Sequence, residues 1–244
     1  MENTIYVGLS RQLALQEHMQ IVSNNIANMT TVGYRGQNMM FTEYLSDPRG
    51  KVDNPKDPLS MVLDYGQYQV TRPGPIKNTG SPFDLALSGP GFFGVQTADG
   101  LQYTRAGNFA LNVNGELVTA AGLPVAGSGG GAIVVPQGAK EVKIAQDGTV
   151  STDQGQVGQI MVTEFDNLQD LKPSGENTYK ALNGGRPATD TKVMQGMVEG
   201  SNIQPVVEMT RMIEISREYQ SIQRMLQSEH DRQRTAVQRL SQRT

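Results

Sequence analysis

Few side chains of this chain are of types that carry out chemistry. It contains no cysteine and two histidines, His18 and His230, which lie far apart in the sequence. The missing cysteines exclude disulfides, thiol nucleophiles and cysteine-ligated metals. Two isolated histidines provide neither a local metal cluster nor a Ser-His-Asp arrangement. We interpret both as solvated helix residues.

Two other patterns resemble catalytic motifs without meeting their requirements. Residues 89–94, GPGFFG, are rich in glycine, but Pro90 removes a backbone N–H and no basic residue follows at the spacing of a phosphate-binding loop. Asp64 and Asp84 could in principle serve glycoside hydrolysis, but the sequence gives no distance between them. We therefore predict a protein that is not an enzyme and that uses no cofactor or metal.

Length and charge limit the partners further. The 244 residues can bury a real core, and the formal net charge of −3 is spread along the chain, which disfavours nucleic acid as a partner. The exception is a basic tail, for which a solvated helix end is favoured over DNA binding: Arg232, Arg234, Arg239 and Arg243. Polar residues interrupt the N-terminus too often for a Sec-type signal, and no run approaches the roughly 18 apolar residues of a membrane span. We expect no membrane insertion, and a cytosolic protein unless another export route reads it.

Both ends of the chain carry helical patterns of apolar residues. At the N-terminus these recur at steps of three and four, apart from a gap across Gln16, and so predict one apolar helix face: Ile5, Leu9, Leu13, Met19, Val22 and Ile26. At the C-terminus a neighbouring row, Val206 and Met209, leads into heptad-like spacing: Met212, Ile215, Tyr219, Ile222 and Leu226. Such helices gain most of their stability from packing the apolar face. The two ends therefore pair within one molecule, as a helical hairpin, or pack against neighbouring copies.

Turn residues mark where these helices end and begin. Asn28 is followed by Gly33, and both tolerate left-handed backbone conformations, so the first helix should end near residues 28–31. We expect Asn28 and Gly33 to shape the exit from this helix. Pro205 suits the first turn of the second helix, where its missing N–H costs nothing.

The middle of the chain reads as β-structure. Asp99-Gly100 and Asn114-Gly115 are two-residue hairpin signals between alternating strands, and Asp147-Gly148 predicts another tight turn. Frequent turns between short strands favour an antiparallel β-sandwich or barrel at residues 73–192. Residues 35–72 are rich in proline and poor in apolar residues, which indicates an extended linker of undetermined conformation.

The predicted fold class is therefore α+β. An N-terminal helix in residues 1–34 pairs with a C-terminal helix in residues 193–244 to form a discontinuous, coiled-coil-like domain. The central β-domain lies between them.

Three blocks of the sequence resemble the flagellar basal-body rod and hook family. The first is residues 23–28, SNNIAN, with residues 30–35, TTVGYR, at the end of the first helix. The second is residues 89–93, GPGFF, with YTRAGNF at 103–109 and Asn114-Gly115. The third is EGSNI at 199–203 with EMTRMI at 208–213. The similarity runs nearly from end to end.

The resemblance implies a structural, non-enzymatic subunit of the bacterial flagellar rod that assembles helically and transmits torque from motor to hook. It also implies a periplasmic location in the basal body, with copies of itself, other rod subunits and the flagellar type III export apparatus as partners. The modest length and the DRQR at 231–234 are most similar to the proximal-rod subunit; the GLSRQ at 8–12 departs from the alanine-rich start often seen in rod proteins.

A distal-rod or hook-type subunit is the alternative within the family. A secreted carbohydrate-acting or carbohydrate-binding β-protein is the competing class outside it. The expected assembly interface consists of the two apolar faces with Asn28, Gly33 and the linker.

Overall fold

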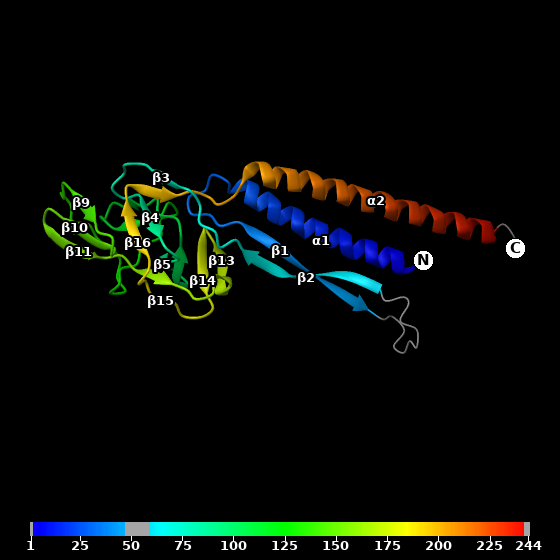
Figure 1. Ribbon diagram of the computed structural model, residues 1–244, viewed down its shortest axis with the longest axis horizontal. Helices are drawn as coiled ribbons and strands as arrows, with labels where there is room; N and C mark the ends of the chain where they lie inside the picture. Colours follow the sequence, from blue (N-terminus) through cyan, green and yellow to red (C-terminus); the bar gives the residue numbers. More distant parts are fainter. Residues whose placement is uncertain (1, 47–58, 242–244) are drawn as a thin grey trace. The chain divides into compact units, whose positions relative to one another are not determined.

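The computed structural model describes residues 2–46 and 59–241 of the chain (Figure 1). The chain forms two compact units. The helical unit comprises the described residues of Met1–Ala27, Gln37–Tyr68 and Gln204–Thr244, and the β unit comprises Asn28–Gly36 and Gln69–Ile203. The chain therefore crosses between the units four times, at residues 27/28, 36/37, 68/69 and 203/204.

The helical unit contains two long helices and a two-stranded sheet. Helix α1 spans Glu2–Ala27 and so ends one residue before the predicted range of 28–31, and α2 spans Pro205–Ser241, which confirms Pro205 as its start. Strands β1 (Gln37–Ser46) and β2 (Leu59–Gln69) form the sheet within the segment that the sequence indicated only as extended. Helix α1 packs against both α2 and β1.

The largest sheet of the β unit has six strands in the order β13-β14-β6-β5-β12-β15. Its strands are β5 (Phe92–Thr97), β6 (Gly100–Thr104), β12 (Val162–Glu164), β13 (Leu171–Gly175), β14 (Thr178–Ala181) and β15 (Arg186–Pro187). The short 3-10 helix η1 (Leu168–Asp170) precedes β13.

A three-stranded sheet and three strand pairs complete the β unit. The three-stranded sheet has the order β11-β10-β9, from β9 (Val142–Ile144), β10 (Thr149–Thr152) and β11 (Gly155–Gln159). The pairs are β16-β4, β17-β3 and β7-β8, from β3 (Ile76–Asn78), β4 (Leu85–Ser88), β7 (Ala110–Leu111), β8 (Leu117–Val118), β16 (Lys192–Gln195) and β17 (Met197–Glu199). All strand pairs of this unit are antiparallel, which confirms the predicted α+β class with antiparallel β-structure.

The predicted tight turns lie where the sequence placed them. Asp99-Gly100 connects β5 to β6, Asn114-Gly115 connects β7 to β8, and Asp147-Gly148 connects β9 to β10. Gly115 has a φ of +80°, and a Cβ at this position would lie 2.5 Å from the backbone oxygen of Val135. Glycine is therefore required at this turn by conformation and by space.

Two apolar clusters form the core of the β unit. The larger one joins the sheets and includes Leu85, Phe93, Val125 and Ile160, each with at most 1% of its surface exposed. The smaller one surrounds Phe92, whose ring meets Phe165 and Tyr179 edge to face at centroid distances of 5.9 Å. These clusters give the strand ends around Phe92 a rigid support.

Candidate functional site

The helical unit is held together by a seam between α1 and α2. Leu15 and Val22 of α1 pack with Ile215 and Ile222 of α2, and all four are buried. Partly buried side chains extend the seam on both helices: Met19, Ile26, Met212, Tyr219 and Leu226. All five α2 residues of the predicted heptad-like spacing lie in this seam, together with Met19, Val22 and Ile26 of the α1 set.

The N-terminal half of α1 reaches α2 through residues that the sequence pattern missed. The seam continues backwards from Leu15 at steps of three and four to Gln12 and Gly8. The Gln12 amide donates a hydrogen bond of 2.9 Å to the Tyr219 hydroxyl, and a Cβ on Gly8 would lie 2.8 Å from the Leu226 Cδ2 atom. A glycine and a glutamine give no hydrophobic signal, so the spacing of apolar residues in the sequence points to Leu13 and not to Leu15.

Leu9 and Leu13 lie outside the seam. They are 47% and 60% exposed, so the prediction that they share a face with Met19, Val22 and Ile26 is wrong. Ile5 keeps the seam's spacing and is half-buried. Leu9 and Leu13 form instead, with the exposed Tyr6, a second row at steps of three and four, which we call the exposed α1 row.

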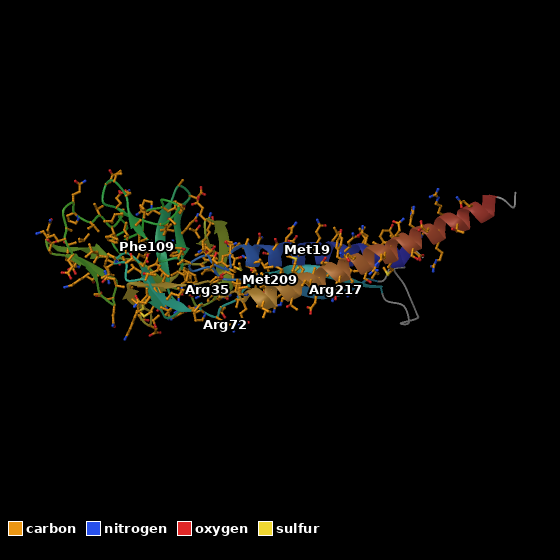
Figure 2. All side chains as sticks on the ribbon, turned by 90° about the horizontal axis from the view of Figure 1, so that it is seen from above. Met19, Arg35, Arg72, Phe109, Met209 and Arg217 are labelled. Carbon is orange, nitrogen blue, oxygen red and sulfur yellow. The ribbon has the colours of Figure 1, made fainter. Side chains whose placement is uncertain are left out.

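Helix α2 carries a comparable surface near its start. Val206, Met209 and Ile213 follow each other at steps of three and four and are 77%, 47% and 53% exposed. We call them the exposed α2 row; Figure 2 shows Met209 on α2 and Met19 on α1. Rows of adjacent exposed apolar side chains are typical of surfaces that meet another protein.

The buried Asn25 links the last turn of α1 to the starts of β1 and α2. Its side-chain amide donates to the backbone oxygen of Gln37 at 2.9 Å and accepts from the backbone N–H of Gln37 at 3.0 Å. The same amide nitrogen donates to Glu208 Oε2 at 3.2 Å, while Glu208 Oε1 accepts from Arg211 at 2.7 Å. The SNNIAN block therefore closes the helical unit through Asn25, which the sequence indicated only as one of the residues that end the first helix.

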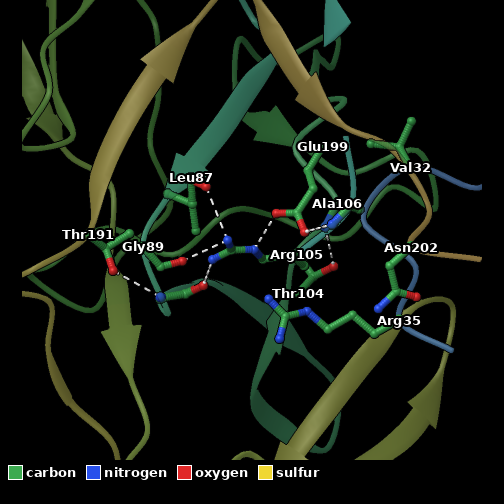
Figure 3. Close-up of polar contacts among 12 residues, drawn as sticks. Val32, Arg35, Leu87, Gly89, Thr104, Arg105, Ala106, Thr191, Glu199 and Asn202 are labelled. Atoms are coloured by element: carbon green, nitrogen blue, oxygen red, sulfur yellow. Dashed lines mark hydrogen bonds and ion pairs between the residues drawn. The ribbon is translucent and has the colours of Figure 1, made fainter. Parts of the chain in front are cut away.

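In the β unit the three resembling blocks meet at Arg105. Its guanidinium is 1% exposed and its Nε lies 2.6 Å from Glu199 Oε2, with Glu199 2% exposed (Figure 3). Nη2 donates to the backbone oxygens of Leu87 at 3.1 Å and Gly89 at 2.8 Å, and Nη1 donates to the oxygen of Gly91. We call Arg105, Glu199 and these three carbonyl groups the Arg105 cluster.

Arg35 brings the first block to the same place. It is 3% exposed, its Nη1 donates to the backbone oxygen of Thr71 at 3.2 Å, and its guanidinium lies 5.2 Å from the centre of the Phe92 ring. Burial, and next the neighbouring Arg105 guanidinium, lower the pKa of Arg35. Burial also raises the pKa of the adjacent Tyr179 to about 12. The cluster is thus a charged but closed core that holds strand ends together.

Gly33 and Asn28 lie at the edge of this arrangement. The backbone N–H of Gly33 donates to the backbone oxygen of Glu199 at 2.7 Å, and its φ is +67°. Asn28 accepts through its backbone oxygen from the N–H of Thr31 at 3.2 Å. Both residues shape the chain just after α1, as expected.

Gly33→Ala should destabilise the β unit more than Gly80→Ala. A Cβ at Gly33 would lie 2.4 Å from the backbone nitrogen of Ala106, whereas Gly80, with a φ of +72°, has no atom within 4 Å. Gly80→Ala should cost about 1 to 2 kcal/mol for the left-handed backbone alone, and Gly33→Ala roughly 1 to 3 kcal/mol more for displaced neighbours. Urea unfolding of both variants measures the difference, and equal losses would contradict it.

Little in the described residues suggests chemistry. Within residues 2–46 and 59–241, no three His, Cys, Asp or Glu side chains are grouped so that they could hold a metal ion. Neither described helix has a stretch long and apolar enough to cross a membrane. The side chain of Asp64, which the sequence paired with Asp84, lies outside the described residues. The geometry instead shows packing surfaces and tightly held chain segments.

Family comparisons match three parts of the chain. Residues 5–35 match the family described as flagella basal body rod protein, residues 86–152 the flagellar hook protein FlgE/F/G D1 domain, and residues 194–239 the flagellar basal body rod FlgEFG protein C-terminal region. Each matched range contains one of the three blocks described above.

Individual relatives match over nearly the whole length. The chain is 40% identical to the flagellar basal-body rod protein FlgF of Caulobacter vibrioides, over 98% of both chains. It is 32% identical to FlgF of Mesorhizobium japonicum, over 91% of this chain and 90% of that one. It is 31% identical to the flagellar basal-body rod protein FlgG of Caulobacter vibrioides, over 86% of this chain and 89% of that one.

Proposed function

The chain belongs to the flagellar basal-body rod protein family, and on that basis we propose that it is a proximal-rod subunit of the FlgF type. Family membership makes it a structural subunit of the bacterial flagellar basal-body rod rather than an enzyme, and implies assembly with other rod subunits. The proposal adds which subunit it is, which surfaces it uses and how it reaches the rod.

The comparison within one organism carries the choice between FlgF and FlgG. Against the two Caulobacter vibrioides proteins, the chain is 40% identical to FlgF over 98% of its length and 31% identical to FlgG over 86%. Identity and coverage both favour FlgF. A subunit of that type belongs to the proximal rod, the part nearest the motor. The modest length of the chain and its DRQR segment at 231–234 also resemble the proximal-rod subunit.

The assembly surface follows from what the helical unit leaves uncovered. The seam uses one face of each helix, while the exposed α1 row and the exposed α2 row remain accessible on the described surface. We infer that neighbouring rod subunits cover these rows. Ile5 and the seam residues hold α1 against α2 and thereby keep the two rows in position. A repeated contact between unlike surfaces that does not close into a ring produces an open helical filament, and torque then passes through the packed helices.

We also propose that the chain reaches the rod as an extended chain through the flagellar type III export apparatus. The support is physical. Helices that depend on packing for most of their stability can pass a channel as extended chain and complete their burial when they dock against neighbouring subunits.

Labelling isolated basal bodies tests the position in the rod. Gold-labelled antibodies against the β unit should mark the rod between its inner-membrane end and its middle. Label towards the hook end would favour a FlgG-type subunit instead. Absence of the protein from basal bodies of swimming cells would contradict both.

A further inference from the structure

We propose that Asn202 is a positioning residue that holds together the places where the chain enters and leaves the β unit. Three of the four crossings are close to Asn202: one follows it in the sequence, and two are next to residues that its side chain contacts. Gly36 is the last residue before the crossing at 36/37, Val70 is the second residue after the crossing at 68/69, and Asn202 is the second-last residue before the crossing at 203/204. All of these residues belong to the β unit.

The Asn202 side chain uses both of its N–H donors and its carbonyl oxygen in hydrogen bonds to the backbone. Its Oδ1 accepts from the backbone N–H of Gly36 at 2.8 Å, and its Nδ2 donates to the backbone oxygens of Val70 at 3.1 Å and Arg72 at 2.8 Å. Its own backbone N–H donates to the oxygen of Tyr34 at 3.3 Å. We call these five residues the Asn202 junction.

One further bond closes the junction without the Asn202 side chain. The backbone N–H of Val70 donates to the oxygen of Gly36 at 2.8 Å, so two of the segments also touch each other directly. Asn202, which is labelled in Figure 3, is 9% exposed, so water has little access to its hydrogen bonds. Bonds that share atoms and exclude water support each other.

The chemistry of the junction selects asparagine. It requires one acceptor and two donors at the end of a short, uncharged side chain. Aspartate offers no donor to the carbonyls of Val70 and Arg72, and alanine offers nothing to either side. The neighbouring Ser201 makes a different kind of contact, in which its Oγ accepts from the N–H of Ile203 at 3.3 Å. Because this contact is confined to adjacent residues, Ser201 is a matched control.

Such a junction suits a subunit under load, and this step rests on the proposed function. Force that passes along the chain through a single crossing would act on one backbone segment. With three crossings held by one buried amide, it is shared among three segments. Through Asn202, the EGSNI block would help the subunit to bear load, in addition to the seam between the helices.

Amide hydrogen exchange on the full-length protein tests the proposal. In Asn202→Ala, exchange at Gly36 and at Val70 should each accelerate by about tenfold or more, the change expected when an ordinary hydrogen bond is lost. Val70 decides the question, because its bond to the Gly36 oxygen does not involve the Asn202 side chain. Acceleration at Gly36 alone would reduce Asn202 to a local partner and overturn the proposal.

Two controls keep the test valid. Ser201→Ala should leave Gly36 and Val70 unchanged, and in every variant the Leu85 amide, which donates to the Gly107 oxygen at 2.8 Å, should stay protected. If Asn202→Ala unfolds the β unit, Asn202→Asp replaces it: Gly36 keeps its acceptor while Val70 loses protection. An unchanged Val70 in that variant also refutes the proposal. These results are independent of where antibodies find the protein in the rod.

Discussion

Ile215→Asp should keep the protein out of the rod and abolish swimming. Ile215 is 5% exposed in the seam with Leu15, Val22 and Ile222, so the substitution removes apolar burial and places an unpaired carboxylate there. The lost burial alone amounts to about 1.5 to 3 kcal/mol, and the unpaired charge adds to it. Helix content measured by circular dichroism should fall, while the thermal unfolding of the β unit should stay nearly unchanged.

Leu13→Asp separates assembly from folding. Leu13 is 60% exposed in the exposed α1 row, so its replacement should leave the helix content of the purified protein unchanged. If neighbouring subunits cover this row, the variant should nevertheless fail to enter basal bodies and reduce swimming severely. Leu182→Asp, at a leucine of the β unit that is 59% exposed and lies outside both rows, is the control and should swim normally. Normal swimming by Leu13→Asp would remove the exposed α1 row from the assembly surface.

Glu199→Leu should destabilise the β unit strongly. The substitution leaves the Arg105 guanidinium buried without its carboxylate, and breaking one partner of a buried ion pair costs about 3 to 5 kcal/mol. Urea unfolding followed by the fluorescence of the tyrosines measures the loss. Swimming should fail at temperatures where the variant unfolds.

Two comparisons show whether the loss comes from the uncompensated charge. Arg105→Met combined with Glu199→Leu should recover part of the stability, since no charge is then buried; recovery stays partial because the carbonyls of Leu87, Gly89 and Gly91 lose their donor. Lys143→Ala breaks the exposed Lys143–Glu141 pair of 3.1 Å and should cost less than about 1 kcal/mol. A Glu199→Leu loss no larger than that of Lys143→Ala would disprove the role of the Arg105 cluster.

Much of the architecture follows from local sequence signals. The 3,4 spacing on α2 predicted its five seam residues, because a helix repeats its faces every few residues whatever it packs against. Asn114-Gly115 predicted the β7–β8 hairpin because Gly115 readily adopts the left-handed backbone conformation, here φ +80°, that this turn requires. Pro205 marked the start of α2 because proline is tolerated in the first turn. In each case the cause lies within a few residues of the signal.

The predictions that were wrong concern residues whose burial depends on partners far away in the chain. Gly8 and Gln12 belong to the seam because Leu226 and Tyr219 lie opposite them, and neither residue carries a hydrophobic signal. Leu9 and Leu13 carry that signal but are exposed, since a helix can have more than one apolar row and only the partner decides which row is buried.

The roles of the buried polar residues in both units also depend on partners that are distant in the sequence. The sequence by itself determined the helices, the turns, the antiparallel β-structure and the three blocks that resemble rod proteins. Only the tertiary structure decided that Arg105 pairs with Glu199, that Asn25 binds the Gln37 backbone and the Glu208 carboxylate, and that Asn202 binds backbone groups of Gly36, Val70 and Arg72. Hydrogen bonds between segments depend on where the chain returns in space, and residue type and spacing do not carry that information.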